Sequence, residues 1–353
     1  MRSITLEILK EERKKGTHEL VLPYSVDGQV RFARTRIVNG EMETFGFPQR
    51  GEQGYRPLGE MITTPAGLDS LVQKTVVDLQ LGREAVPLLY TPIYRRMEDP
   101  NFTENVDVTP FTGASVVFLQ HMELGEVAFG ARRVGAKETV PIVTYTAGLE
   151  WTEDIVLYDK TWEVAEAARA MGEAYNALLN HIHLSPILTY AYAAKNQTPA
   201  DNTGGTYREK LRNTIKAGLI HASQDENTDT RARRRPTIIL AHSSKRWDIE
   251  EVLARMVIGG TEYPAIGGLS TAIYYDGYSV VMGEKTYTYE GCDPGKAYLI
   301  DPTKYFRELV KHDLRVDAAG PDLKRLVENA IVGRVRRGVI ASPANAVEEL
   351  TLP

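Results

Sequence analysis

The sequence predicts an α+β fold built from several discontinuous lobes. Apolar residues recur at alternating steps of four and three from Val164 to Ile182, which is the pattern of one face of a long helix. Short strand-like segments bounded by Gly and Pro precede and follow this helix in the sequence. No repeat with a period of about 20–50 residues is visible, which argues against a solenoid or a propeller.

The bulk composition is that of a globular protein: 353 residues, of which 42% are hydrophobic and 25% charged. The formal net charge is -5, from 42 basic and 47 acidic residues, whereas proteins that grip nucleic acid through its phosphates usually carry a basic excess. The single cysteine, Cys292, excludes an intrachain disulfide and a multi-cysteine metal site. No segment resembles a secretory signal or approaches the ~20 apolar residues that cross a bilayer, so we expect no membrane partner.

The first 60 residues are irregular and offer little apolar surface for a core. We expect a short helix at Ile4–Lys14 and strand-like pieces around His18–Leu22 and Gln29–Val38. The Gly-rich run Gly40–Gly59 has few periodic apolar positions and cannot bury much by itself. The segment 1–60 is therefore either a flexible tail or an arm that becomes ordered on another subunit, and we expect the arm.

A long two-stranded ribbon is expected between residues 115 and 148. Its strand-like pieces flank one Gly-bounded turn: Ser115–Gln120, then Glu126–Phe129 and Thr139–Tyr145 around the turn Gly130–Lys137. This arrangement places Arg132, Arg133 and Lys137 at the tip. Because an isolated two-stranded ribbon is marginally stable in water, we expect it to lie on a neighbouring subunit, with these three cations in the contact.

Helices and short strands follow one another through the rest of the chain. The longest helix is expected to be capped by Thr152–Asp154 and to run through Trp162 to about Asn180, a length of roughly 30 Å that makes it the spine of the protein. The other expected elements are the helices Asp69–Leu81, Tyr207–Ala222 and Arg246–Met256, the strands Pro236–Leu240 and Ala297–Ile300, and paired strands within 326–342.

Four of these features occur together in a recognisable order. They are the ribbon leading through 149–154 (LEWTED) into the alanine-rich helix, the strand 237–242 (TIILAH) followed by a short helix, the strand 296–302 (KAYLIDP), and the closing strand that runs into a proline at 338–346 (GVIASPANA). The ordered set, over roughly residues 65–350, resembles the major capsid proteins of tailed bacteriophages, whose fold is named after phage Hong Kong 97. Each motif is weak alone, and the set as a whole is specific.

The resemblance implies how the chain is divided. The expected parts are an N-terminal arm (1–60), the first part of a peripheral domain (61–114), an extended loop (115–148), the peripheral domain with the spine helix (149–225), an axial domain near the capsomer symmetry axis (226–302), and return strands of the peripheral domain (303–353).

The resemblance also implies the partners of the chain. Copies of it form hexamers and pentamers in an icosahedral shell, which encloses double-stranded DNA without reading its sequence and is assembled in the cytoplasm of the bacterial host. No enzymatic activity, cofactor or metal is implied. The spine helix begins too early for a long scaffolding segment to precede it, so we expect a separate scaffolding protein and a portal, and a decoration protein is an open alternative.

Some members of the family are crosslinked between a Lys on the extended loop and a distant Asn. The corresponding pair here is Lys137 and Asn329. A Lys in a Gly-rich turn is usually just solvated, so we expect a non-covalent shell.

Three short motifs suggest other chemistry. His181-x-His183 has metal-ligand residue types, but no acidic or Cys residue accompanies it and residues two apart on a helix point apart. The segment from His242 to Ser244 could supply a hydrolase nucleophile, but it lacks the G-x-S-x-G elbow, and Ser-Ser after a strand more often caps the next helix. The basic run Arg231–Arg235 follows acidic residues, so we expect a solvated or intersubunit salt-bridged loop.

The sequence thus supports three hypotheses. The first is a phage major capsid protein, which we expect. The second is the shell protein of an encapsulin-type nanocompartment, which shares the fold and stores a cargo enzyme. The third, from a different class, is an α+β hydrolase that uses His242 and Ser244.

Overall fold

The structure is a computed structural model of the whole chain. It describes residues 19–26, 29–38, 41–44, 65–108, 111–115, 131–134, 138–152, 161–224, 233–258, 261–282, 284–303, 306–319 and 327–353. The chain divides into two compact units, which are described separately below. The first unit comprises Met1–Leu88, Thr144–Leu179 and His312–Arg336, and the second comprises Leu89–Val143, Asn180–Lys311 and Arg337–Pro353.

The N-terminal segment contains a small antiparallel sheet in the first unit. Its strands are β1 (Glu19–Val26), β2 (Gln29–Val38) and β3 (Glu41–Thr44), in the order β1-β2-β3. The two predicted strand-like pieces correspond to β1 and β2, whereas β3 lies within the run for which no strand was expected. The predicted helix Ile4–Lys14 lies outside the described residues.

The first unit also contains a close pair of helices, α3 (Pro65–Ala85) and the N-terminal part of α5 (Thr161–Leu188). Glycines make this approach feasible. A Cβ added to Gly172 of α5 would lie 2.0 Å from the carbonyl oxygen of Leu79, and one added to Gly82 of α3 would lie 1.9 Å from that of Arg169. The two backbones therefore come closer than any side chain at these positions would allow.

Helix α5 is longer than the sequence indicates, and its predicted start is wrong. Thr152 is the last residue of strand β9 (Val143–Thr152), and the helix begins at Thr161. It continues past Asn180 to Leu188, with Pro186 inside it. A proline in the final turn removes one backbone donor, which shortens the hydrogen-bond ladder there without preventing two more helical residues.

Four nested strands form the predicted ribbon in the second unit. They are β5 (Asn105–Val108), β6 (Phe111–Ser115), β7 (Ala131–Val134) and β8 (Glu138–Pro141), with β5 paired to β8 and β6 paired to β7 in antiparallel register. The pairing begins at Asn105, ten residues before the predicted start. The connection between β6 and β7 is residues 116–130, so the turn is not at Gly130–Lys137 as predicted.

A four-stranded sheet has the order β4-β18-β19-β9. Its other members are β4 (Arg95–Glu98), β18 (Arg307–Ala319) and β19 (Val327–Ile340). The paired strands predicted within 326–342 are instead one long strand, β19, whose neighbours in the sheet are β18 and β9. In the second unit, Ile340 packs into a small core with Val140, Ile142 and Leu309.

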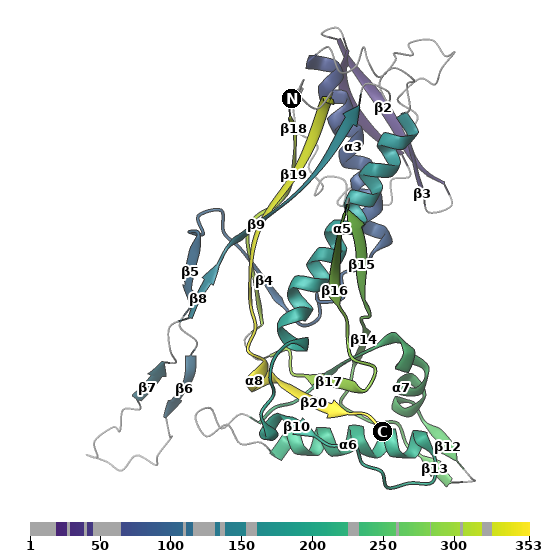
Figure 1. The fold of residues 1–353 in the computed structure, drawn as a ribbon, viewed down its shortest axis with the longest axis vertical. Helices are drawn as coiled ribbons and strands as arrows, with labels where there is room; N and C mark the ends of the chain where they lie inside the picture. The colour runs from purple at the N-terminus through teal and green to yellow at the C-terminus, as the bar shows by residue number, and fades with distance from the viewer. Residues whose placement is uncertain are drawn as a thin grey trace, which may run out of the picture. The chain divides into compact units, whose positions relative to one another are not determined.

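The main core of the second unit surrounds a five-stranded sheet (Figure 1). The strand order is β10-β20-β17-β11-β14, with bounds Gln197–Thr198, Val347–Thr351, Lys296–Ile300, Ile238–Ala241 and Thr271–Tyr274. Strand β11 is buried along its whole length, as its apolar sequence predicts. The predicted axial segment 226–302 supplies only three of the five strands, since β10 and β20 come from outside it.

Two helices cover this sheet. On α6 (Tyr207–Gln224), a Cβ at Gly218 would lie 2.3 Å from Leu350 of β20, so the helix backbone lies close to the sheet. On α7 (Arg246–Leu253), Ile249 and Val252 are buried in the same core. The helix predicted to reach Met256 ends at Leu253, because the chain turns there into strand β12 (Met256–Ile258).

The remaining short elements of the second unit are two hairpins and three helical turns. They are β12 with β13 (Thr261–Tyr263), β15 (Gly277–Met282) with β16 (Lys285–Glu290), η1 (Ala194–Asn196), η2 (Ser243–Lys245) and α8 (Pro343–Ala346).

Candidate functional site

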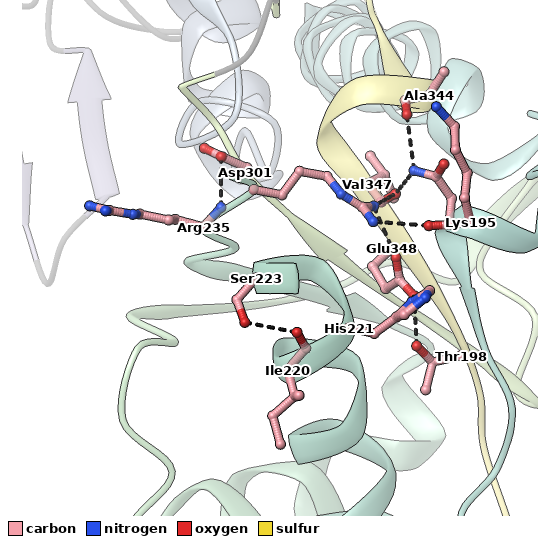
Figure 2. A network of polar contacts seen from close by, with 12 residues as sticks. Lys195, Thr198, Ile220, His221, Ser223, Arg235, Asp301, Ala344, Val347 and Glu348 are labelled. Carbon is pink, nitrogen blue, oxygen red and sulfur yellow. Dashed lines mark hydrogen bonds and ion pairs between the residues drawn. The ribbon is translucent and has the colours of Figure 1, made fainter. Parts of the chain in front are cut away.

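A buried polar network in the second unit joins four separate chain segments (Figure 2). At its centre is the carboxylate of Glu348, which is fully buried on β20. Its Oε1 accepts a hydrogen bond of 2.6 Å from Thr198 Oγ1 and lies 2.6 Å from Nδ1 of His221, and its Oε2 lies 2.9 Å from Nη1 of Arg234. Because a carboxylate can only accept, the Nδ1 atom of His221 carries the proton in this contact.

Two of the three nitrogens of the Arg234 guanidinium donate hydrogen bonds within the same network. Its Nη1 donates to the carbonyl of Val347 at 2.9 Å, and its Nη2 donates to the carbonyl of Lys195 at 3.0 Å. The side-chain amide of Asn196 donates to the same Val347 carbonyl at 2.7 Å. These contacts, with those of Glu348, join the last strand of the chain to η1, α6 and the segment that enters β11.

A second buried cluster in the same unit centres on Glu308 of β18. Its carboxylate forms an ion pair with Arg337 of β19, accepts a hydrogen bond of 3.1 Å from the Tyr90 hydroxyl, and lies 3.5 Å from Nε2 of His183. The His183 ring stacks on Tyr90 with centroids 3.7 Å apart. All four side chains are buried, so this cluster also joins chain segments internally.

The two histidines of the His181-x-His183 motif face different surroundings, as predicted for residues two apart on a helix. Both lie within α5 and not after it. His183 belongs to the Glu308 cluster, whereas the His181 ring packs edge-on against Tyr289 of β16, at 4.4 Å between centroids. Burial lowers the pKa of His181, and the nearby carboxylate of Glu290 opposes this effect. The pair therefore does not converge on one ion.

His242 caps the η2 turn, and its geometry with Ser244 differs from that of a base with its nucleophile. The Nδ1 atom of His242 accepts the backbone N–H of Ser244 at 3.1 Å and lies 2.9 Å from the Ser244 hydroxyl. The Asp276 carboxylate approaches the same nitrogen at 3.6 Å. A catalytic triad needs the serine and the acid on opposite ring nitrogens, so these three residues are not arranged as one.

The same loop corrects the prediction that the serines cap the helix. Asp276 accepts the backbone N–H of Ser243 at 2.7 Å, and its carboxylate also takes the Ser243 hydroxyl. His242 and Asp276 thus cap the η2 turn, whereas Lys245, the N-cap residue of α7, makes no side-chain cap hydrogen bond. Burial raises the pKa of Asp276, but the hydrogen bonds from Ser243 and the nearby His242 outweigh this and leave that pKa below its ordinary value.

Only two of the three predicted contact residues of the ribbon lie within the described part of the chain. Arg132 and Arg133 lie in strand β7, opposite Ala114 and Gly113 of β6, so they lie along the ribbon and not in its terminal turn. Lys137 lies outside the described residues. Asn329 lies in β19, and the expectation of a shell without a crosslink between Lys137 and Asn329 stays a prediction.

A large aromatic side chain is exposed on α7, and sequence patterns did not single it out. Trp247 has 74% of its surface exposed. The guanidinium of the preceding Arg246 lies 5.6 Å from the Trp247 ring and 5.7 Å from the ring of Tyr274, and its Nε donates to Glu250 at 2.9 Å. Among the first residues of a short helix, only the tertiary structure shows which side faces the core.

Within the described residues, no group of three or more His, Cys, Asp or Glu side chains is placed to hold a metal ion. In the same part of the chain, every helix is too short or too polar to cross a bilayer.

Comparison with known proteins gives one family. A family model described as "Phage capsid protein" matches residues 136–340, which is more than half of the chain. No characterised protein matches the chain in sequence at a significant level.

Solved structures similar to this chain include one from Mycobacterium phage Bobi, with a TM-score of 0.48 and 13% identity, covering 74% of this chain and 89% of that one. The capsid of Myoviridae phage XM1 has a TM-score of 0.48 and 10% identity, covering 75% and 92%. An encapsulin complex from Synechococcus elongatus has a TM-score of 0.45 and 14% identity, covering 76% and 88%. All three structures resemble this chain only distantly, so the assignment of the family rests on the family-model match.

Proposed function

This chain belongs to the phage capsid protein family, and from that membership we propose that its copies assemble as hexamers and pentamers into the icosahedral shell of a tailed phage. The family match over residues 136–340 is the observation that carries the proposal. It also confirms the predicted family and the structural, shell-building role. The protein is a component of the virion capsid.

The ribbon supports assembly with neighbours. Its β5–β8 part packs on the chain's own core through Val140, whereas the β6–β7 part is a two-stranded pair. Such a pair is marginally stable without a surface to lie on, and a second copy supplies one. In the proposed shell, the arm (1–60) and the extended loop (115–148) reach over adjacent subunits, and the axial domain (226–302) faces the capsomer axis. Arg132, Arg133 and Lys137 remain the proposed contacts of the loop.

The proposed content of the shell is double-stranded DNA, held without sequence-specific contacts. The net charge of -5 supports this role, since a wall that bound phosphates tightly would carry a basic excess. Assembly in the host cytoplasm, a separate scaffolding protein and a portal complete the proposal. A non-enzymatic role is supported by the family and by the His242 loop, whose polar groups cap a helix.

The test is direct imaging of the expressed chain, with and without a co-expressed scaffolding protein. We expect closed shells of uniform size with pentameric and hexameric units in negative stain. Small globular particles under every condition would overturn the proposal. The contents of the shells separate the two shell hypotheses, because packaged DNA indicates a phage capsid and a packaged enzyme indicates a nanocompartment.

A further inference from the structure

The hairpin β12–β13 is a short excursion from the core of the second unit (Figure 1). The chain leaves this core after Val252 and returns to it at Ile266. At the base of the excursion, the backbone N–H of Ile266 donates to the carbonyl of Leu253 at 3.1 Å. Beyond the base, Val257 is 64% exposed. Because a two-stranded hairpin is marginally stable by itself in water, its position depends on how its base is held.

A single buried arginine of α6 contacts the chain on both sides of this hairpin. Arg212 is only 1% exposed. Its Nη1 donates to the carbonyl of Val252 at 3.2 Å, and its Nη2 donates to the carbonyl of Pro264. The first carbonyl precedes β12 and the second directly follows β13. One planar guanidinium, with its donors in a fixed fork, thus bridges the two chain segments at the base of the hairpin.

The charge of Arg212 is unusual for its position in the core. Among the described residues, no carboxylate forms an ion pair with it, and its contacts are the two carbonyls and the ring of Tyr263, 5.6 Å from the guanidinium. On the same helix, Leu211 and Ile215 are apolar and fully buried. Desolvating a charge costs free energy, and well-packed apolar side chains often replace buried charged groups without loss of stability. Core packing therefore does not explain an arginine here, whereas the base of the hairpin does.

A second link joins the hairpin to the same helix through Glu209. The hydroxyl of Tyr263, the last residue of β13, donates to Oε1 of Glu209 at 2.9 Å. The Oε2 atom accepts the backbone N–H groups of Gly205 and Thr206, at 2.7 and 3.0 Å. This carboxylate thus caps the N-terminus of α6 and holds one strand of the hairpin. Residues three apart lie on one face of a helix, so Glu209 and Arg212 hold the hairpin from the same face.

We propose that Arg212, assisted by Glu209, holds the hairpin β12–β13 at a fixed angle in the unassembled chain. The buried charge sets the direction of this projection and adds little to the stability of the core. In the proposed shell, the hairpin lies in the segment 226–302 that faces the capsomer axis. A hairpin that is already in position lowers the cost of ordering it when copies meet. This last step rests on the proposed function, whereas the hold on the hairpin does not.

Hydrogen exchange of the full, unassembled chain tests the hold on the hairpin. Arg212→Met keeps an apolar stem and removes the guanidinium. We expect peptides within 254–264 to exchange at least about tenfold faster in this variant, because local opening of the hairpin then breaks fewer contacts. Exchange in α6 and β11 and the midpoint of urea unfolding should match those of the parent chain.

Two further variants separate the links. Tyr263→Phe keeps the ring beside Arg212 and removes only the hydroxyl that Glu209 accepts, so we expect a smaller rise within 254–264, about threefold. The matched control is Arg208→Met. This exposed cation of α6 pairs with Glu251 of α7 at 2.5 Å, and its loss should leave the exchange of the hairpin unchanged.

The inference is overturned if Arg212→Met exchanges within 254–264 at the parental rate. A uniform rise in exchange with a lower urea midpoint, or a variant that does not fold, would also overturn it, because the guanidinium would then support the core as a whole. Parental exchange in Tyr263→Phe would remove Glu209 from the proposal.

Assembly measures the part that rests on the proposed function. We expect Arg212→Met to need about threefold more protein than the parent for half-maximal assembly, because its hairpin must be ordered on contact. An equal requirement would show that assembly does not use the preset hairpin. If the parent chain forms no shells, the proposed function fails, while the exchange result still decides whether Arg212 holds the hairpin.

Discussion

Each of the two units of this chain is stabilised internally by a different kind of contact. In the first unit, α3 and α5 lie against each other at Gly82 and Gly172, where the missing side chains let the two backbones nearly touch. In the second unit, strand β20 is held by the buried carboxylate of Glu348, which contacts Thr198, His221 and Arg234. The contact between α3 and α5 (the helix joint) depends on shape, and the Glu348 network on β20 (the charged joint) depends on charge. The same protein should therefore respond to added volume in one unit and to lost charge or protonation in the other.

The largest expected effect is at the charged joint. Glu348→Ala leaves Arg234 buried without its partner, and breaking a buried pair in this way costs about 3–5 kcal/mol. We expect the free energy of unfolding of the unassembled chain to fall by about that amount, measured by urea denaturation.

The matched controls separate charge from shape at this joint. Replacing both partners, Glu348→Leu with Arg234→Met, removes the stranded charge and should recover most of the loss. Glu349→Gln on the same strand removes the charge from a 3.0 Å pair with the half-exposed Lys296 and keeps a side-chain oxygen that can accept from Gln197 Nε2. It should change stability by less than ~1 kcal/mol. A Glu348→Ala variant as stable as the parent would show that the joint does not depend on charge.

The next largest effect is expected at the helix joint. Gly172→Ala would place a Cβ 2.0 Å from the carbonyl oxygen of Leu79, so α3 and α5 must separate. Overpacking of this kind costs typically 1–3 kcal/mol. Thermal unfolding followed by circular dichroism at helical wavelengths measures the loss.

Gly267→Ala is the control for a glycine that touches nothing. No atom lies within 4 Å of its added Cβ, so we expect a change close to zero. Since backbone carbonyls cannot be moved by a rotamer change, Gly82→Ala should be as harmful as Gly172→Ala. If Gly172→Ala and Gly267→Ala unfold at the same temperature, the helices are not in contact at this position.

The smallest expected effect is a pH dependence confined to the second unit. Burial lowers the pKa of His181 in the folded chain, so the unfolded chain binds more protons near and below the ordinary value of about 6.5. The stabilisation from neutral His181 is complete above that pH and is lost as the pH falls toward the lower, folded pKa. We expect the hairpin β15–β16 to loosen on acidification, because Tyr289 packs on this ring.

Hydrogen exchange of the β15–β16 amides between pH 7 and pH 5, corrected for the intrinsic rate, measures this loosening. His181→Phe keeps the ring contact with Tyr289 and should abolish the pH dependence. Exchange in α3 and the N-terminal half of α5 should stay constant over the same range. A pH response that persists in His181→Phe would assign it to another group.

Most elements of the fold were predictable because their patterns are local. The apolar period from Val164 to Ile182 identifies α5, and the buried run before Ala241 identifies β11, since each pattern records burial along its own element. The ends of the helices and strands were harder to predict. The capping residues expected at Thr152–Asp154 belong partly to a strand, because cap-forming residue types also occur in strands and loops. The predicted position of the ribbon's turn was wrong for a related reason, because Gly130 and Gly135 permit a turn without requiring one.

The polar networks were not predictable. Glu348 lies in a Val-Glu-Glu-Leu-Thr strand in which its neighbour Glu349 pairs with Lys296 instead, and nothing local distinguishes the two. The two partners of Glu348 with nitrogen donors, His221 and Arg234, are more than one hundred residues away along the chain.

The sequence by itself determined the α+β class, the order of the elements and the capsid family, because residue periodicity and an ordered set of motifs survive without three-dimensional information. Only the tertiary structure decided which charges are buried and which groups face outward. Arg234 and Arg235 are adjacent and chemically identical, yet one closes a buried network and the other points into solvent. The reason is physical: burial depends on which distant segments converge on a position, and the pairing of β20 with β17 and β10 sets that convergence.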